Sequence, residues 1–219
     1  MLPSLNQSLQ AIARYFGYNK TCPLCRTELS QLEDLLCTHC YQALPWQVLP
    51  IKQTITPLLS AFTYASPIKQ LILEGKNSKS LDKIQLLAQL LEQKFPSLIT
   101  ELPEAILPVP LHFKRLRQRG FNQSVELVRP LAQHLGIPLI LKQIIRQRYT
   151  DEQKKLAAFE RQHNLAQAFQ LVQPMPYKHI AIFDDVVTTG ATCAELEILL
   201  SDHGVEKIQI WCCAQTKMT

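Results

Sequence analysis

The stretch HIAIFDDVVTTGATCAELEILL, residues 179–200, decides the fold of this chain. It begins with the apolar run IAIF, which is typical of a strand buried on both faces. Asp184 and Asp185 follow, where we expect the strand to end. A loop of small hydroxyl residues around Gly190 comes next, and apolar residues at helical spacing predict a helix from about Thr192. The stretch therefore predicts a strand, an acidic pair, a loop and a helix in direct succession.

This succession suits a phosphorylated ligand. The helix N-terminus and the loop N–H groups favour an anion such as phosphate. Gly190 lets the backbone approach closely, and the threonine hydroxyls add donors. The two carboxylates can accept hydrogen bonds from sugar hydroxyls or hold a hydrated Mg²⁺. Because successive strand residues point to opposite faces, the two aspartates need not share one role.

Three other interpretations of the acidic pair can be weighed. A P-loop NTPase requires a GxxxxGK[ST] loop, and the chain contains none. A dinucleotide-binding fold would show GxGxxG, which is also absent. An ordinary strand–turn–helix with a solvated acidic cap remains an alternative, because caps rich in Thr and Asp are common.

The sequence IFDDVVTTGAT resembles the phosphoribosyl pyrophosphate (PRPP) binding motif of type I phosphoribosyltransferases. That motif has apolar residues, Asp-Asp, two apolar residues and Thr-Thr-Gly-x-Thr. The resemblance implies that Asp184 and Asp185 are the catalytic pair, which engages the ribose hydroxyls and stabilises developing positive charge. It also implies that the residues after them cradle the 5-phosphate. The implied PRPP-binding loop consists of Val187, Thr188, Thr189, Gly190, Ala191 and Thr192.

Length and composition bound the class of protein. With 219 residues, the chain can form one α/β domain and a small appendage. Its 47% hydrophobic and 19% charged residues indicate a packed core. The net charge of +5 is compatible with anionic ligands but too weak to establish nucleic-acid binding. We expect no transmembrane segment and no secretory signal. Since the cysteine spacing also suits a reducing compartment, we expect a cytoplasmic location.

Four of the seven cysteines form two CxxC pairs. Cys22 and Cys25 are separated by eleven residues from Cys37 and Cys40. This spacing suits a structural, tetrahedral Zn²⁺ site of ribbon or knuckle type and a reducing compartment. A disulfide pair or unrelated buried cysteines are the alternative. We predict an N-terminal helix and zinc module over residues 1–45 and a second domain over 46–219.

A basic stretch follows a short apolar strand predicted at 105–109. It places four cations within six residues, and we expect it to form a loop off the strand end. Such a cluster can gather phosphate or pyrophosphate, because arginine binds phosphate oxygens bidentately. A solvated basic surface loop is the alternative. The candidate residues in and after this loop are Arg115, Arg117, Arg119, Asn122 and Gln123.

The motif PVPLH with RxRGFNQ resembles the ComF branch of phosphoribosyltransferase-like proteins. The double CxxC and the later stretch RYTDEQKKLAAFERQHNLAQAF share this resemblance, which covers essentially the whole chain. The chain departs from the family at 74–76, where Glu-Gly-Lys replaces the usual Leu-Lys-Tyr/Phe. The resemblance and the alternating strand and helix patterns predict an α/β fold. We expect a Rossmann-like parallel sheet of the type I phosphoribosyltransferase kind, with helices on both faces.

The segment 137–172 should open with a short strand at 137–141. The long, polar and basic continuation is typical of a mobile lid over a polyanionic substrate, or of a plain surface helix at about 151–163. Resemblance to the flexible catalytic loop of phosphoribosyltransferases makes Arg148 and Gln153 further pyrophosphate candidates. Other expected elements are an amphipathic helix at 1–18, strands at 58–64, 168–172 and 207–212, and helices at 67–73 and 81–94.

Two functions follow from the resemblance. In the first, a ComF-like protein binds PRPP with Mg²⁺ and handles incoming single-stranded DNA in natural transformation. The DNA-uptake machinery at the inner membrane is then an implied partner. In the second, a nucleotide-salvage phosphoribosyltransferase transfers ribose 5-phosphate to an unidentified acceptor without binding DNA.

Overall fold

The computed structural model describes residues 21–30, 34–47, 56–76, 80–147 and 168–216. The chain divides into two compact units, Met1–Leu44 and Pro45–Thr219. The helix predicted at 1–18, the lid or helix predicted at 151–163, and the candidates Arg148 and Gln153 lie outside the described residues.

The first unit is organised by its two cysteine pairs. Cys22 opens a tight turn in which its N–H donates to the Thr27 carbonyl at 2.7 Å. The second pair belongs to the short helix α2 (Thr38–Gln42), which Cys37 caps. The Cys37 sulfur accepts from the Cys40 N–H at 3.5 Å. Each pair therefore closes its own turn and brings two sulfurs together.

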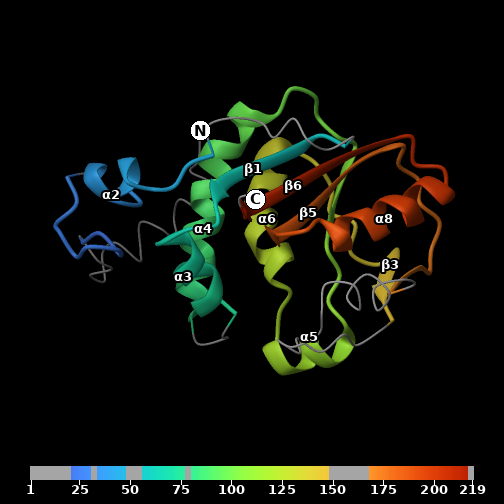
Figure 1. Ribbon diagram of the computed structural model, residues 1–219, viewed down its shortest axis with the longest axis horizontal. Helices are drawn as coiled ribbons and strands as arrows, with labels where there is room; N and C mark the ends of the chain where they lie inside the picture. The colour runs from blue at the N-terminus through green and yellow to red at the C-terminus, as the bar shows by residue number, and fades with distance from the viewer. Residues whose placement is uncertain (1–20, 31–33, 48–55, 77–79, 148–167, 217–219) are drawn as a thin grey trace, which may run out of the picture. The chain divides into compact units, whose positions relative to one another are not determined.

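The second unit contains a four-stranded parallel sheet (Figure 1). Its spatial order is β1 (Leu58–Thr63), β6 (Lys207–Gln215), β5 (His179–Val187) and β2 (Ala105–Pro108). The helical segments are α3 (Ile68–Glu74), α4 (Leu81–Lys94), the 3-10 helix η2 (Phe95–Leu98), α5 (Phe113–Arg119), α6 (Gln123–Leu135) and α8 (Ala191–Asp202). An antiparallel hairpin pairs β3 (Ile144–Arg146) with β4 (Phe169–Leu171). This α/β architecture with a parallel sheet confirms the predicted fold class.

Apolar layers cover both faces of the sheet. Ile180 and Ile182 of β5 belong to one buried cluster with residues of α8 and of the hairpin. On the other face, Phe183 packs edge-on against Phe95, with ring centroids 6.5 Å apart, and Phe95 contacts Trp211 at 5.2 Å. Figure 1 shows α8 and the hairpin at one side of this unit and α3 and α4 at the other. Burial on both faces explains why β5 is a continuous apolar run.

Several elements lie where the sequence predicts them. β1, α3, β4 and β6 correspond to the expected strands and helix, and α4 has the predicted bounds. Ile84, Leu87 and Leu91 of α4 are buried, as their helical spacing predicts. No described helix combines the length and apolar character that a membrane span requires.

β5 continues through the acidic pair, which corrects the prediction that the strand ends before it. Asp184 is still paired in register with Cys212 of β6. On the other side, β2 stops at Pro108, opposite Phe183. Proline lacks the N–H that a sheet ladder requires. From Asp184 onward, β5 is therefore held by β6 while β2 no longer pairs with it.

Two further segments differ from prediction. The basic stretch expected to be a loop forms α5, which ends at Gly120 with a φ of 85°. Its sequence FKRLRQR is made mostly of good helix formers, so propensity outweighs the lack of an apolar stripe. The strand predicted at 137–141 is reduced to one parallel bridge between Leu139 and Ile106. Chain pairing resumes only at β3, which is antiparallel to β4.

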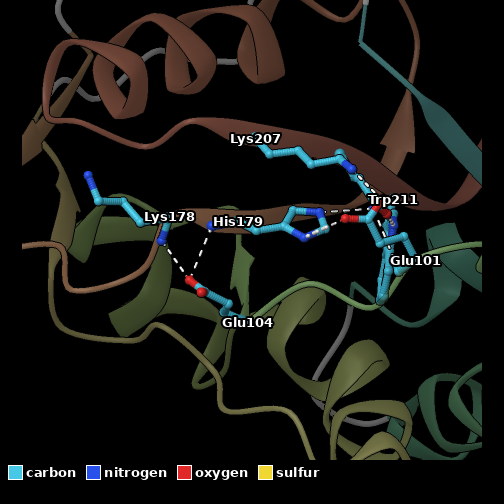
Figure 2. Close-up of polar contacts among 7 residues, drawn as sticks. Glu101, Glu104, Lys178, His179, Lys207 and Trp211 are labelled. Carbon is cyan, nitrogen blue, oxygen red and sulfur yellow. Dashed lines mark hydrogen bonds and ion pairs between the residues drawn. The ribbon is translucent and has the colours of Figure 1, made fainter.

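Polar side chains connect the strands at their amino ends (Figure 2). We call this side of the sheet the amino edge. The Glu104 carboxylate accepts from the backbone N–H groups of Lys178 at 2.6 Å and His179 at 3.2 Å. Glu101 forms an ion pair with Lys207, and its other oxygen lies 3.7 Å from His179 Nδ1. Hydrogen bonds and ion pairs thus satisfy both carboxylates at this edge.

Gln209 connects this amino-edge network to the core. Its Nε2 lies 3.0 Å from His179 Nε2 and donates to the Glu101 carbonyl at 3.0 Å. Its Oε1 accepts from the indole N–H of Trp211 at 2.9 Å. The buried amide therefore links the start of β5, the start of β6 and the chain that leads into β2.

Candidate functional site

The candidate site lies at the opposite, carboxyl edge of the sheet, where β5 passes into α8. Ligands of open parallel sheets bind beyond the carboxyl ends of the strands. Asp184 and Asp185 are half-buried there, and Thr188 and Thr189 in the following loop are exposed. The structure therefore brings acidic acceptors and exposed donors to one edge.

Asp184 is a desolvated carboxyl group with two hydrogen bonds. Its Oδ1 accepts from the Asp185 N–H at 2.8 Å and from the Ser124 hydroxyl at 3.3 Å. Burial and the charge of Asp185 raise the pKa of Asp184 well above its usual value. A carboxylate in this position gains more than an exposed one from a cation or from hydroxyl donors.

Asp185 meets different groups. Its Oδ2 lies 3.8 Å from Lys76 Nζ, just beyond the end of α3, and its Oδ1 accepts from the Val186 N–H at 2.9 Å. Burial and the charge of Asp185 raise the pKa of Tyr64. The alternation of side chains along a strand explains why adjacent aspartates have separate partners.

The loop after β5 forms the N-cap of α8. Gly190 has a φ of 75°, and a Cβ atom there would meet nothing within 4 Å, so space beside it is open. The Ala191 N–H lies 3.4 Å from Thr189 Oγ1. First-turn N–H groups of a helix lack intrahelical acceptors and can bind an anion. Of the predicted loop residues, Val187 is buried, Thr188 and Thr189 are exposed, and Gly190, Ala191 and Thr192 are half-buried.

Arg146 of β3 connects the basic helix α5 with the acidic pair electrostatically. Its guanidinium lies 5.4 Å from the centroid of the Phe169 ring. Burial and the charge of Arg115 lower the pKa of Arg146, while Asp184 and Glu195 act in the opposite direction. The charges of Arg115 and Asp184 thus both act on Arg146. Of the other α5 candidates, Arg117 is exposed and Arg119 is half-buried.

The two amide candidates are engaged in the fold. Asn122 donates to the Val109 carbonyl at 3.0 Å and caps α6 by accepting from the Ser124 N–H at 3.0 Å. Gln123 is 2% exposed and donates to the Ile72 carbonyl at 3.1 Å. Their contacts fix the chain between β2 and α6 at the carboxyl edge.

Three residues near the acidic pair were not among the predicted site residues. Ser124 directly follows the two predicted amide residues, Lys76 marks a departure from the family pattern, and Arg146 is one cation among several. Each comes from a different element, and none belongs to the motif at 179–200. A lysine following the first strand and helix was the one available signal, and it is weak.

The cysteine cluster in the first unit is compatible with a metal site. The sulfur atoms of Cys22, Cys25, Cys37 and Cys40 all lie within 4.8 Å of one another. Four sulfurs around a tetrahedral Zn²⁺ would be about 3.8 Å apart, given Zn–S bonds of about 2.3 Å. Contact with Thr27 lowers the pKa of Cys25 to about 6. Four thiols this close can hold a metal ion after small shifts.

Comparison with curated proteins identifies close relatives. The chain is 37% identical over 200 residues to DNA utilization protein YhgH of Salmonella typhimurium, covering 89% of this chain and 84% of that protein. The Escherichia coli protein of the same name is 36% identical over 202 residues, with the same coverage. Competence protein F of Haemophilus influenzae is 43% identical over 114 residues, covering 51% of this chain and 50% of that protein. No family model matches the chain.

Among solved structures, the matches include phosphoribosyltransferases. Adenine phosphoribosyltransferase of Leishmania tarentolae has a TM-score of 0.41 at 13% identity, covering 78% of this chain and 94% of that one. The Leishmania donovani enzyme has a TM-score of 0.42 at 12% identity, covering 76% and 86%.

Proposed function

The chain belongs to the family of DNA utilization protein YhgH and Competence protein F, and from that premise we propose that it binds PRPP with Mg²⁺ and handles single-stranded DNA during natural transformation. The observation that carries the PRPP part is the junction of β5 and α8. It presents two carboxylates, an open glycine and exposed threonines within eight residues of chain.

Each group at this junction has a distinct role in the proposal. Asp184 and Asp185 accept hydrogen bonds from the ribose hydroxyls, directly or through hydrated Mg²⁺. The loop hydroxyls and the first N–H groups of α8 hold the 5-phosphate. Arg115 and its neighbours on α5 supply positive charge for the pyrophosphate. Mg²⁺ would neutralise part of the negative charge of the pyrophosphate.

Calorimetric titration tests this assignment. The full chain with Mg²⁺ should bind PRPP with a Kd below about 1 mM, the upper end of common substrate constants. Ribose 5-phosphate and pyrophosphate, each offered alone, should bind more weakly because each fills part of the site. Absence of saturable PRPP binding would contradict the proposal. Release of pyrophosphate when nucleobases are added would favour the salvage enzyme as the second candidate.

The DNA part of the proposal rests on the relatives and on charge. The relatives are named for DNA utilization and competence, and the helix α5, which follows β2 in the chain, carries four cations. A backbone-binding protein should lose affinity steeply with salt, by about 0.7 units of log K per log unit of salt for each phosphate contact. Fluorescence anisotropy with a labelled oligothymidylate measures this slope. No binding at low salt would exclude the DNA role, and the PRPP role would stand.

The proposal includes Zn²⁺ in the four-cysteine cluster as a structural ion. Thiolate ligands are stable in a reducing compartment, so we also propose a cytoplasmic location, next to the uptake machinery at the inner membrane. Freshly purified protein should contain about one Zn²⁺ per chain, and replacing Cys37 with Ser should release it. Metal analysis that finds no zinc would contradict the ion assignment.

A further inference from the structure

We infer that the exposed face of α5 is a contact surface for single-stranded DNA, in which the Phe113 ring stacks on a base while neighbouring cations hold phosphates. This inference rests on the proposed handling of single-stranded DNA and deepens it. The proposal above uses only the positive charge of α5, whereas the structure shows an exposed aromatic side chain next to those cations.

The apolar side chains of α5 are largely exposed. None of its residues is buried. Phe113 is 58% exposed and Leu116 is 43% exposed, although a helix of a folded domain ordinarily buries its apolar residues. Of the aromatic side chains that the structure describes, Phe113 is the most exposed. Exposed apolar groups that are surrounded by charge commonly mark an interaction site.

Helical spacing places apolar and basic groups on one face. Leu116 and Arg117 follow Phe113 by three and four residues, so all three side chains are neighbours on the helix surface. Arg117 is exposed and forms no ion pair with any residue that the structure describes. The helix contains four cations and no acidic residue. An anionic partner with flat apolar groups, such as single-stranded DNA, is complementary to this face.

The ring of Phe113 is also oriented before binding. The ring of His112 lies 4.5 Å from it at an interplanar angle of 42°. His112 is itself buried, and its Nδ1 accepts from the Lys114 N–H at 3.3 Å, which fixes the imidazole. One side of the phenyl ring is therefore backed by a fixed aromatic group. A pre-oriented platform loses less conformational freedom when a base stacks on it.

The surface is connected to the proposed PRPP site. Val109, at the start of the excursion that carries α5, donates its N–H across the sheet to the Phe183 carbonyl at 2.9 Å. Asn122, at the end of the excursion, donates to the Val109 carbonyl at 3.0 Å. Both ends of the excursion are thus joined beside the acidic pair. DNA on α5 would lie at the edge of the sheet that carries the candidate site.

The test uses the full chain and a labelled oligothymidylate at low salt. Replacing Phe113 with Ala should weaken binding by roughly five- to hundredfold, the range measured for base–aromatic stacking. Phe113→Trp should retain affinity, and DNA should quench the new tryptophan fluorescence. Arg117→Gln should weaken binding and reduce the salt slope by about 0.7. The matched control, Ile198→Ala on the exposed surface of α8, should bind like wild type.

The outcomes separate this inference from the proposal on which it rests. If wild type fails to bind DNA, the DNA role is wrong and the inference with it. If wild type binds and Phe113→Ala binds equally well, only the inference is overturned. If Phe113→Ala loses binding to phosphatidylglycerol vesicles but binds DNA like wild type, the face is assigned to a membrane. A loss of self-association on sedimentation would assign it to a second copy, and either result overturns the inference. Unchanged thermal unfolding of the variants confirms that they fold.

Discussion

The two edges of the parallel sheet each carry two carboxylates, yet the environment of Asp184 at the carboxyl edge is opposite to that of the pair at the amino edge. At the amino edge, Glu101 and Glu104 are exposed and fully engaged by a lysine, a histidine and backbone N–H groups. These contacts lower the pKa of both groups. At the carboxyl edge, burial and Asp185 raise the pKa of Asp184.

This difference teaches which edge stabilises the fold and which is available for a ligand. Carboxylates whose charge the fold satisfies contribute to stability at neutral pH. A carboxylate whose charge the fold disfavours lowers stability at neutral pH, and it gains when a ligand supplies the missing donors or cation. Acidic side chains of the same class thus have a structural role at one edge and a proposed binding role at the other.

The largest expected effect comes from replacing the carboxylates of each edge in turn by neutral amides. The double variant Asp184→Asn, Asp185→Asn should weaken Mg²⁺–PRPP binding at least about hundredfold, because two charged hydrogen-bonding groups are lost. The matched variant Glu101→Gln, Glu104→Gln should leave the PRPP Kd unchanged. Calorimetry measures both constants. Wild-type affinity in the aspartate variant would remove the site assignment.

A second experiment measures how the charge of Asp184 affects the free energy of unfolding. Asp184→Asn should raise the free energy of unfolding at pH 7 by roughly 0.5–2 kcal/mol, since Asn keeps the acceptor oxygen and removes a disfavoured charge. The raised pKa means that the charge penalty is full above that pKa and vanishes as pH falls below the ordinary value of 3.8. Urea unfolding over a pH series should therefore show the two proteins converging in acid. A variant less stable than wild type at pH 7 would contradict the desolvation argument.

Lys76 offers a smaller test of the carboxyl edge. Its ammonium lies 3.8 Å from Asp185 Oδ2 and is partly exposed, so its loss should weaken PRPP binding only about two- to fivefold. Lys207→Ala at the amino edge is the control, and it should not alter PRPP binding. Equal effects of the two lysines would mean that general charge, rather than position, determines affinity.

Glu104 should give the smallest effect and the opposite pH dependence. Glu104→Gln weakens the acceptor for the Lys178 and His179 N–H groups, so the Tm at neutral pH should fall slightly. Because the pKa of Glu104 is lowered in the folded state, its contribution is present above the ordinary pKa and is lost as pH falls through the lowered one. Thermal unfolding at pH 7 and in acid measures this. A Tm difference between wild type and variant that grows as the pH falls would contradict the predicted pH dependence.

Local elements were largely predictable from residue pattern. α4 was predicted at its observed bounds because its apolar residues repeat at helical spacing and are buried together. β5 and α8 followed from an apolar run and a small-residue loop around Gly190. The paired cysteines likewise come together as their spacing predicts.

The incorrect predictions concern segments in which the local residue pattern and the tertiary structure favour different conformations. α5 was predicted as a loop because it is a cluster of cations directly after a strand, but its residues are mostly good helix formers and the helix ends at Gly120. The apolar segment 137–141 was predicted as a strand, but only one bridge joins it to Ile106. The strand end at the acidic pair was misplaced because pairing with β6 continues beyond it.

By itself, the sequence determined the chemistry available at the junction of β5 and α8: two carboxylates, hydroxyl donors and a glycine that permits a left-handed turn. Only the tertiary structure decided that Ser124 and Lys76, from two other elements, would lie against those carboxylates. The reason is physical. Local order follows from the period and propensity of neighbouring residues, whereas desolvation and the choice of partner depend on which distant segments the packed core brings together.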